Sequence, residues 1–238
     1  PEILVAGCGT GQHDLDTVSR FSKANMLAVD LSLSSLSYAL RKVNEIRLSN
    51  IEYAQADIME LGNLGRRFDL IVCLGVLHHL GDPLAGWRVL VDLLRPGGLM
   101  NIGLYSETAR RDIISGHSII AEKGYTTSAE DIRRCRQDFI AMVEDGNPTM
   151  AKICNGRDFF SLSECRDLLF HVQEHRFTLP QIDEALQSLH LKFLGFEMRD
   201  QRALKQFKES HPNSNALTSL SLWHKFELDN PDTFQGMY

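Results

Sequence analysis

The chain has 238 residues, a formal net charge of −6 and a pI of about 5.8, and 43% of its residues are hydrophobic. This composition is ordinary for a globular protein and excludes a disordered chain. Nucleic-acid binders usually present a basic face, and the sequence has no basic block, so we expect no nucleic-acid partner. The longest apolar runs, such as residues 70–77, are shorter than the roughly 18–20 residues of a membrane span, and no signal peptide opens the chain, so we expect no membrane partner.

The five cysteines indicate a reduced, cytoplasmic protein. Their number is odd and no two are spaced C-x-x-C, which argues against a disulfide framework and a zinc knuckle. The chain begins at Pro1 rather than Met, a strand is predicted almost at once, and the sequence ends among aromatic residues at Tyr238. We therefore expect it to be part of a longer polypeptide.

Strands and helices alternate regularly over residues 1–105. We expect strands over 3–6, 26–29, 51–56, 70–74 and 99–105, and helices over 12–22, 34–44 and 83–94, with Asp82 as an N-cap and Arg95–Gly98 ending the last helix. The apolar run of the fourth strand is typical of a strand buried on both faces. This alternation predicts an α/β fold with an open, mostly parallel, Rossmann-like sheet.

The alternation stops after Tyr105. Residues 106–190 predict helices over 108–115, 128–144, 163–175 and 180–189, and we expect this helical insertion to form a lid. Residues 191–197 predict a sixth strand, residues 217–230 a helix, and Asn230-Pro231 the start of another short helix. The predicted organisation is an α/β core over 1–105, the insertion over 106–190, and a segment over 191–238 that completes the core.

A glycine-rich turn follows the first predicted strand, with Gly7, Gly9 and Gly11 spaced G-x-G-x-G. Glycines there allow unusual backbone angles and a close approach of ligand to backbone. Asp30 closes the second strand, where a carboxylate can accept hydrogen bonds from ribose hydroxyls. Gln12 replaces the third glycine of the dinucleotide fingerprint, which disfavours the rival hypothesis of a nicotinamide dehydrogenase.

Five motifs of the first 105 residues resemble the class I S-adenosylmethionine-dependent methyltransferases, in particular the group with VLHHL after its fourth strand. They are GCGTG (7–11), AVDLS (28–32), AD (56–57), FDLIVCLGVLHHL (68–80) and LRPGG (94–98). Residues 157–182 and 222–238 are also similar to the methyltransferase domains of large bacterial tetratricopeptide-repeat proteins. The resemblance implies a methyltransferase that uses S-adenosyl-L-methionine, a small-molecule or peptide acceptor, and a longer chain with repeat domains.

The resemblance also implies the residues of the cofactor site. The loop would comprise Gly7, Cys8, Gly9, Gly11 and Gln12, with Asp30 on the ribose, Leu31 against the adenine, Asp57 on the adenine amino group, Ile58 on a ring nitrogen, and Leu74 with Gly75 below the sulfonium. The family usually has an acid two residues before the first glycine, where this chain has Val5; Gln12 or His13 would substitute. This departure supports an alternative function, a module that binds the cofactor without turnover.

Three residues at the carboxyl edge of the predicted sheet are candidates for catalysis. His78 and His79 follow the fourth strand, and an imidazole can act as a general base near neutral pH. Tyr105 ends the fifth strand and could orient an acceptor. Packing in the pocket wall is the alternative for each. Since the sulfonium is already an activated leaving group, the protein mainly aligns the reactants, and a base is optional.

The segment HVQEH matches H-x-x-E-H, the inverted zinc-protease spacing, and predicts His171 and His175 on one helix face. A metal hydrolase is therefore a third rival function. The sequence marks no third ligand, so we expect no metal. We expect Arg157, His171 and His175 to be substrate contacts on the inner face of the lid.

Overall fold

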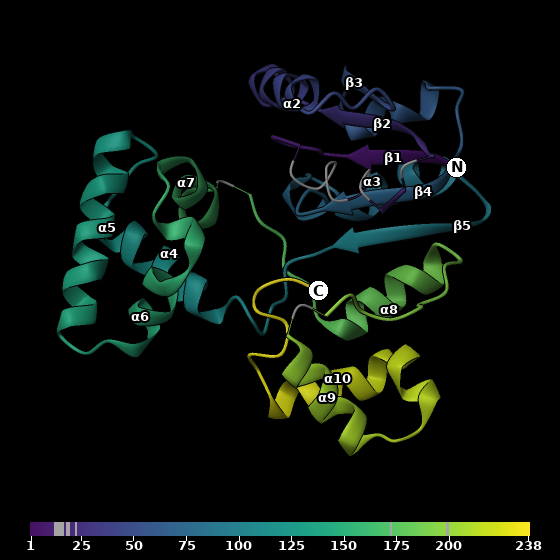
Figure 1. Ribbon diagram of the computed structural model, residues 1–238. Helices are drawn as coiled ribbons and strands as arrows, with labels where there is room; N and C mark the ends of the chain where they lie inside the picture. The colour runs from purple at the N-terminus through teal and green to yellow at the C-terminus, as the bar shows by residue number, and fades with distance from the viewer. Residues whose placement is uncertain (12–16, 18–19, 22, 172, 199) are drawn as a thin grey trace.

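The computed structural model describes residues 1–238 except 12–16, 18–19, 22, 172 and 199 (Figure 1). Most of the helix predicted over 12–22 lies outside the described residues. A sheet covered by helices forms one part of the molecule, and a group of helices stands beside it, at the edge toward which the arrowheads of β1 and β5 point (Figure 1).

The sheet has five parallel strands in the order β3-β2-β1-β4-β5. They are β1 (Glu2–Ala6), β2 (Asn25–Asp30), β3 (Ile51–Gln55), β4 (Phe68–Leu74) and β5 (Leu94–Gly103). Alternate residues of β1 enter two different hydrophobic cores: Leu4 and Ala6 belong to one, and Ile3 and Val5 to the other. A strand buried on both faces requires an apolar sequence throughout, as β1 has. The open parallel sheet with helices confirms the predicted α/β class.

Short helices cover the two faces of this sheet. They are α2 (Leu33–Glu45), η1 (Ile58–Asn63), η2 (Leu77–His79) and α3 (Pro83–Asp92). The predicted start of α3 is confirmed: Asp82 is its N-cap and accepts a hydrogen bond from the Ala85 N–H at 2.9 Å, and Pro83 occupies the first turn.

The helices beside the sheet form a second core. They are α4 (Arg111–Lys123), α5 (Ala129–Glu144), α6 (Pro148–Asn155), η3 (Arg157–Phe159) and α7 (Leu162–Phe170). Ile132, Cys135, Phe139, Phe159 and Cys165 are fully buried among them. We call residues 111–170 the helical cluster. Its hydrophobic residues pack on one another, so the cluster has its own centre.

The remaining helices pack against the sheet. They are α8 (Leu179–Ser188), α9 (Gln201–Ser210), η4 (Ser214–Thr218) and α10 (Leu220–Asp229). Leu179 and Ile182 of α8 share the main core with Phe207 and Trp223, whose rings stack at 3.5 Å. The sequence placed α8 in the insertion, whereas the structure packs it with the C-terminal helices on the sheet.

The predicted sixth strand is wrong. Residues 191–197 pair with no strand of the described sheet. Their apolar side chains instead pack among aromatic rings: Phe196 contacts Phe193 at 4.8 Å, Phe234 at 4.7 Å and Trp223 at 5.5 Å between ring centroids. Gly195, with φ of 135°, interrupts the extended backbone. Aromatic packing therefore accounts for the apolar pattern that suggested a strand.

Three smaller predictions also need correction. Arg95–Gly98 belongs to β5 and not to the end of α3, because Leu94 already pairs with Phe68, before a shift in register to Leu70 and Leu99. Tyr105 lies beyond the end of β5 and forms an isolated bridge to Met237. Residues 231–236 form turns and not a helix.

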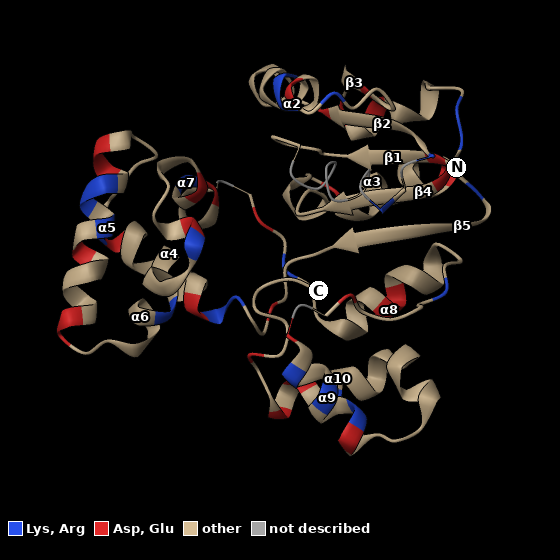
Figure 2. Cartoon of the chain, in the orientation of Figure 1, with Lys and Arg blue, Asp and Glu red and all other residues tan. Residues whose placement is uncertain are grey.

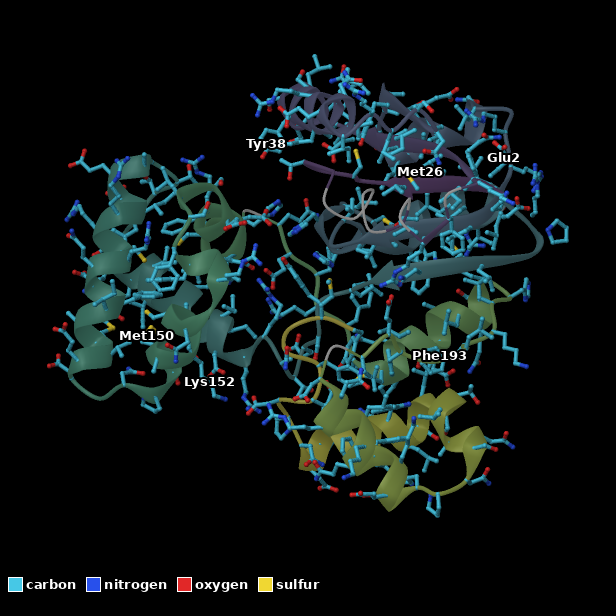
Figure 3. The ribbon with its side chains drawn as sticks, viewed as in Figure 1. Glu2, Met26, Tyr38, Met150, Lys152 and Phe193 are labelled. Atoms are coloured by element: carbon cyan, nitrogen blue, oxygen red, sulfur yellow. The ribbon has the colours of Figure 1, made fainter. Side chains whose placement is uncertain are left out.

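Charged residues of both signs are interspersed on the outer helices, as on α5 (Figure 2). Met26 lies in the sheet part and Met150 in the helical cluster, each 1% exposed (Figure 3). All five cysteines are free thiols. Within the described residues, the helices are too short or too polar to span a membrane.

A buried carboxylate ties the C-terminus to the end of β5. Glu227 of α10 is 1% exposed and accepts hydrogen bonds from the Ser106 hydroxyl at 2.9 Å and the Tyr238 hydroxyl at 2.8 Å. Tyr238 also exchanges backbone hydrogen bonds with Leu104. Burial raises the pKa of Glu227 above its ordinary value, against the lowering effect of these hydrogen bonds.

We expect the stability of the protein to fall as the pH rises through the interval between the ordinary and the raised pKa of Glu227. The folded state binds a proton there that the unfolded state has released, so the linkage opposes folding at the higher pH. Glu227→Gln should flatten this part of the curve, measured as the free energy of unfolding in urea at several pH values. Identical pH slopes for the two proteins would contradict the assignment.

Candidate functional site

The order of the strands reverses at β1. The chain passes outward through β2 and β3 on one side and returns to β4 and β5 on the other. Open parallel sheets bind ligands in the crevice at such a reversal, outside the carboxyl ends of the strands. The glycine-rich loop follows β1, Asp30 ends β2 and Gly75 follows β4, so the predicted cofactor residues meet at this crevice.

The loop needs its glycines for two different reasons. Gly7 and Gly9 have φ of 81° and 54°, in the region that favours glycine. A Cβ on Gly7 would lie 2.2 Å from Val76 Cγ2, so packing of the loop on the chain after β4 forbids a side chain there. A Cβ on Gly9 would meet no described atom within 4 Å, so the space beside Gly9 is open to a ligand.

Asp30 holds the loop against the end of β2. Its Oδ2 accepts the Gly9 N–H at 2.8 Å, and its Oδ1 accepts the Ser32 N–H at 2.8 Å. Each carboxylate oxygen has lone pairs left, so Asp30 can still accept from two adjacent hydroxyls. One carboxylate thus fixes the loop and faces the crevice.

The other residues implied for the cofactor lie around this loop. Leu31 is 61% exposed, which leaves its side chain free to cover a flat ring. Asp57 is the N-cap of η1 and accepts the Met59 N–H at 2.9 Å, whereas Ile58 is buried in the main core and has only its backbone to offer. Cys8 is 3% exposed and packs in the core on the α2 side of the sheet, and Leu74 is the last residue of β4. Gln12 and His13 lie outside the described residues.

Val5 occupies the position of the usual acid before the loop, and other groups hold the loop in place. Its side chain is 2% exposed in the core on the α2 side of the sheet. The N–H groups of Gly7 and Cys8 donate to the Val29 carbonyl at 2.8 and 3.0 Å, and Gly9 is held by Asp30. The described loop is therefore fixed by the backbone of β2 and by Asp30 without an acid at position 5.

His78 is a buried, neutral imidazole. It is 0% exposed, and its Nδ1 accepts the Tyr105 N–H at 3.2 Å. Burial lowers its pKa to about 2, helped by the nearby His79 and Arg110. Because the Nδ1 lone pair is used, Nε2 carries the proton, and this N–H has no hydrogen-bond partner among the described residues. In this state the ring can donate a hydrogen bond through Nε2–H, but its one lone pair, on Nδ1, is already engaged by the Tyr105 N–H and is not free to accept a proton.

His79 has the opposite arrangement. Its Nδ1 lies 3.0 Å from the Gln173 carbonyl oxygen, which can only accept, so Nδ1 carries the proton and Nε2 keeps a free lone pair. Burial lowers the pKa of His79 below its ordinary value, against the hydrogen bond to Gln173. Of the two histidines, His79 is the one whose ring can act as a base or bind a metal.

The Tyr105 ring contacts two flat groups, the imidazole of His78 and the guanidinium of Arg110. It stacks on His78 at 3.6 Å, and the Arg110 guanidinium lies 3.6 Å from the ring centroid on a cation–π contact. Burial raises the pKa of the Tyr105 phenol, so it remains protonated near neutral pH. These three side chains form one wall at the end of β4 and β5.

The segment that connects α7 to α8 lies along this wall, and we call its described residues, 171 and 173–177, the connecting segment. The His175 N–H donates to the His78 carbonyl at 2.8 Å, and the Phe177 N–H to the Tyr105 carbonyl at 2.9 Å. The predicted helix through His175 is wrong: α7 ends at Phe170, because these residues bond to η2 and Tyr105 across the sheet edge. His171 and His175 therefore do not share a helix face.

The three predicted substrate residues are not brought together. His171 lies against His79, with ring centroids 3.8 Å apart, and His175 follows on the connecting segment. Arg157 is an exposed residue of η3 in the helical cluster and contacts neither histidine in the described structure.

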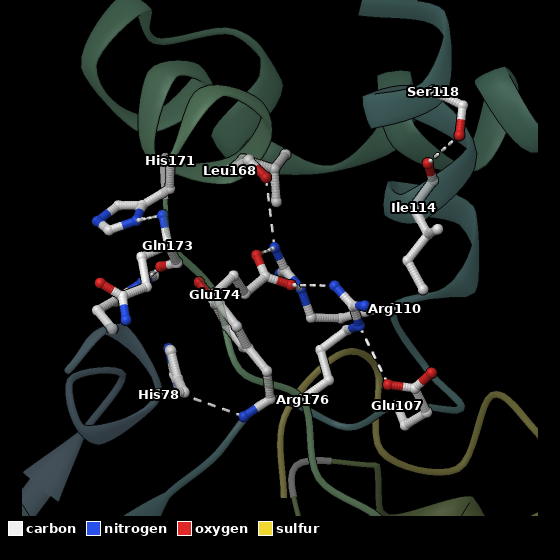
Figure 4. A network of polar contacts seen from close by, with 12 residues as sticks. His78, Glu107, Arg110, Ile114, Ser118, Leu168, His171, Gln173, Glu174 and Arg176 are labelled. Carbon is white, nitrogen blue, oxygen red and sulfur yellow. Dashed lines mark hydrogen bonds and ion pairs between the residues drawn. The ribbon is translucent and has the colours of Figure 1, made fainter. Parts of the chain in front are cut away.

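Sequence reasoning missed a buried ion pair at the centre of the site. Arg110 and Glu174 side chains are 5% and 4% exposed, and two guanidinium nitrogens donate to the two carboxylate oxygens at 2.8 and 2.6 Å (Figure 4). Arg110 also donates to the Leu168 carbonyl at 3.3 Å. The pair joins the chain after β5, the helical cluster and the connecting segment. The one sequence signal for this pair is the acid of the H-x-x-E-H segment, where it is part of a pattern typical of metal sites.

A groove of about 1590 Å³ leads to this wall. Its lining includes residues of β5 and of 189–198, together with Leu74, Gly75, Tyr105, Arg110 and Asp167. The groove therefore includes the end of β4, beside the cofactor residues.

Comparison with known proteins gives a family match for the first part of the chain. Residues 3–98 match the family described as a methyltransferase domain. The chain is 27% identical to a malonyl-[acyl-carrier protein] O-methyltransferase of Priestia megaterium, over 76% of the chain and 58% of that protein. It is 29% identical to an uncharacterized protein of Synechococcus, over 96% of the chain and 56% of that protein. The chain thus spans somewhat more than half the length of these relatives.

The fold of nearly the whole chain is also found in solved structures. PKMT2 from Rickettsia typhi superposes with a TM-score of 0.72 and 16% identity, covering 99% of this chain and 47% of that one. The same protein in complex with AdoHcy gives a TM-score of 0.71 and 18% identity over the same shares. At this identity the likeness concerns the fold alone, and it includes the helical cluster.

We expect Glu174→Ala to destabilise the protein strongly, because it leaves the Arg110 charge buried without its partner. Breaking such a pair costs about 3–5 kcal/mol. Glu107→Ala is the matched control: Glu107 pairs with Arg176 at 3.1 Å but is 48% exposed, and a surface pair is worth about 1 kcal/mol or less. Urea unfolding measures both variants, and equal losses would show that the buried pair does not hold the cluster in place.

Proposed function

Since residues 3–98 form a class I S-adenosylmethionine-dependent methyltransferase domain, we propose that this chain transfers the methyl group of S-adenosylmethionine to a small-molecule or peptide acceptor. The observation that carries the proposal is the convergence of the glycine loop, Asp30 and the end of β4 at the reversal of the sheet. The names of the relatives support the reaction class but differ in acceptor, so the acceptor stays unidentified.

The residues present fit the cofactor. The open space beside Gly9 accommodates a ligand next to the backbone, and the free lone pairs of Asp30 suit two ribose hydroxyls. Leu31 would cover the adenine, with the Asp57 carboxylate toward the adenine amino group and the Ile58 backbone toward a ring nitrogen. Gly7, Cys8, Gly11, Gln12 and Leu74 complete the set that we propose from the family resemblance.

When bound, the cofactor supplies a methyl group on a positively charged sulfur, a leaving group that needs no acid. The task of the chain is then to hold an acceptor in line with that methyl group and to exclude water. We propose that the acceptor enters through the groove along β5 and meets the wall of His78, Tyr105 and Arg110. The aromatic and cation–π stacking keeps this wall rigid, which favours a fixed alignment.

The three candidate catalytic residues have different proposed roles. His78 can offer its unpartnered Nε2–H as a hydrogen-bond donor, and Tyr105 its protonated hydroxyl. If the acceptor must lose a proton, His79 is the imidazole with a free lone pair for it. His171 and His175 stay candidate substrate contacts beside this wall, and Arg157 a candidate on the outer cluster.

Two further proposals concern the setting of the chain. The five free thiols support a cytoplasmic location. The share of the relatives' length that the chain covers is consistent with further segments, and tetratricopeptide repeats stay a prediction from the sequence resemblance.

We expect Asp30→Ala to lower cofactor affinity at least about tenfold, because charge-assisted hydrogen bonds contribute about 1.5–3 kcal/mol each. Calorimetry with S-adenosylmethionine or its demethylated product measures the change. The matched control is Asp82→Ala, which also loses a carboxylate that accepts a backbone N–H, at the N-terminus of α3. The control should lose stability but not affinity; an unchanged affinity for Asp30→Ala would remove this residue from the site.

We expect Gly9→Val to abolish cofactor binding while the protein still folds. A Cβ at Gly9 meets no described atom, so the substitution costs only the strain of φ at 54° and fills the ligand space. Gly7→Val is the contrasting variant, because its side chain collides with Val76 and should lower stability as well. Circular dichroism and calorimetry separate the two effects, and normal binding by Gly9→Val would mean that the loop does not contact the ligand.

A further inference from the structure

Three potential metal ligands meet where the helical cluster contacts the sheet edge. His79, Asp167 and His171 each place one ligand atom within 4.8 Å of the others. His79 belongs to η2, at the carboxyl end of β4. Asp167 lies on α7, and His171 is the residue directly after the end of α7. The three donors thus come from both parts of the molecule.

The imidazole of His79 is already oriented as a metal ligand. Its Nδ1–H donates to the Gln173 carbonyl at 3.0 Å, which leaves the Nε2 lone pair free. A hydrogen bond from the other ring nitrogen to a backbone carbonyl is the usual way in which proteins fix the tautomer and direction of a ligating histidine.

Asp167 and His171 offer complementary donors. They are four residues apart, a spacing that places side chains on one side of a helical turn, and both are exposed. The Asp167 carboxylate has no hydrogen bond or ion pair with any described residue, although it contributes to the electrostatic environment of His79. His171 Nδ1 accepts the Gln173 N–H at 3.3 Å, a long hydrogen bond that metal binding can replace (Figure 4).

We propose that His79, Asp167 and His171 bind a divalent transition-metal ion of the zinc type. Two imidazoles and one carboxylate suit zinc and its neighbours, and three protein ligands leave a coordination position for water. The ion would link α7 to η2 and so hold the helical cluster against the sheet edge. This proposal does not rest on methyl transfer, and it departs from the expectation of no metal.

The structure selects a different set from the one that the sequence motif suggested. His175 holds His78 through its backbone, and its ring Nε2 lies 3.4 Å from the Gln173 side chain. Glu174 is engaged by Arg110. Only His171 of the H-x-x-E-H segment therefore joins the site. A metal ion on His79 would also occupy the lone pair that a general base needs, so the two roles of His79 exclude each other.

The test is a titration of the full chain with Zn²⁺ by calorimetry after treatment with a chelator, and with Co²⁺ by absorption spectroscopy. We expect one equivalent to bind, and we expect Asp167→Ala and His79→Ala each to weaken binding at least about a hundredfold. His175→Ala, a histidine of the same segment, is the matched control and should bind as the wild type does. Asp167 is exposed, so its variant keeps the test valid if His79→Ala does not fold.

A second measurement tests the link between the two parts. Zn²⁺ should slow amide hydrogen exchange of the connecting segment in the wild type and leave it unchanged in Asp167→Ala. The proposal is overturned if the wild type binds no stoichiometric Zn²⁺ or Co²⁺, or if Asp167→Ala and His79→Ala bind as tightly as the His175→Ala control.

Discussion

The arrangement of the site depends on a charge that the fold has buried. Arg110 lies just beyond β5 with its side chain 5% exposed, and such a charge is tolerated inside a protein only when its donors are satisfied. Glu174 takes two of these donors, the Leu168 carbonyl takes another, and the Tyr105 ring covers one flat face. These partners come from separate segments, so satisfying one cation fixes the helical cluster, the connecting segment and the wall of the site together.

Asp30 has a comparable role on the cofactor side. The class of proteins that the chain resembles usually orients its glycine loop with an acid before the first glycine, and Val5 cannot do this from the core. The hydrogen bond from the Gly9 N–H to Asp30 restores a carboxylate contact to the loop from the next strand. The absence of an acid at position 5 therefore does not by itself argue for a module without turnover.

Local sequence patterns predicted the sheet but not what lies beyond it. The continuous apolar run of β1 and the Asp82-Pro83 start of α3 depend on neighbours in sequence, and both are confirmed. The strand predicted over Leu191–Glu197 is wrong because an apolar run is compatible with packing in an aromatic cluster as well as with a strand. The end of α7 at Phe170 and the bond from His79 to Gln173 could not be predicted, because both depend on contacts between residues far apart in the sequence, 94 positions for His79 and Gln173. His79 and His171 are expected from the sequence to have separate roles, and Asp167 is not among the expected site residues, because nothing in the local pattern shows that the three side chains meet.

The two ends of the long excursion after β5 are joined to each other. Ser106 bridges to Phe177, and the Glu107 N–H donates to the Phe177 carbonyl at 2.9 Å, so the chain leaves and re-enters the sheet part at almost one point. The helical cluster between these residues has its own hydrophobic centre, and its further contacts with the rest of the molecule include the ion pairs of Arg111 and Lys152 with Asp232. A segment inserted in this way can be lengthened, replaced or lost without disturbing the strands on either side. Because both ends of the excursion meet at Ser106, Glu107 and Phe177, a separately packed group of helices can stand beside the site while β4 and β5 keep their parallel pairing.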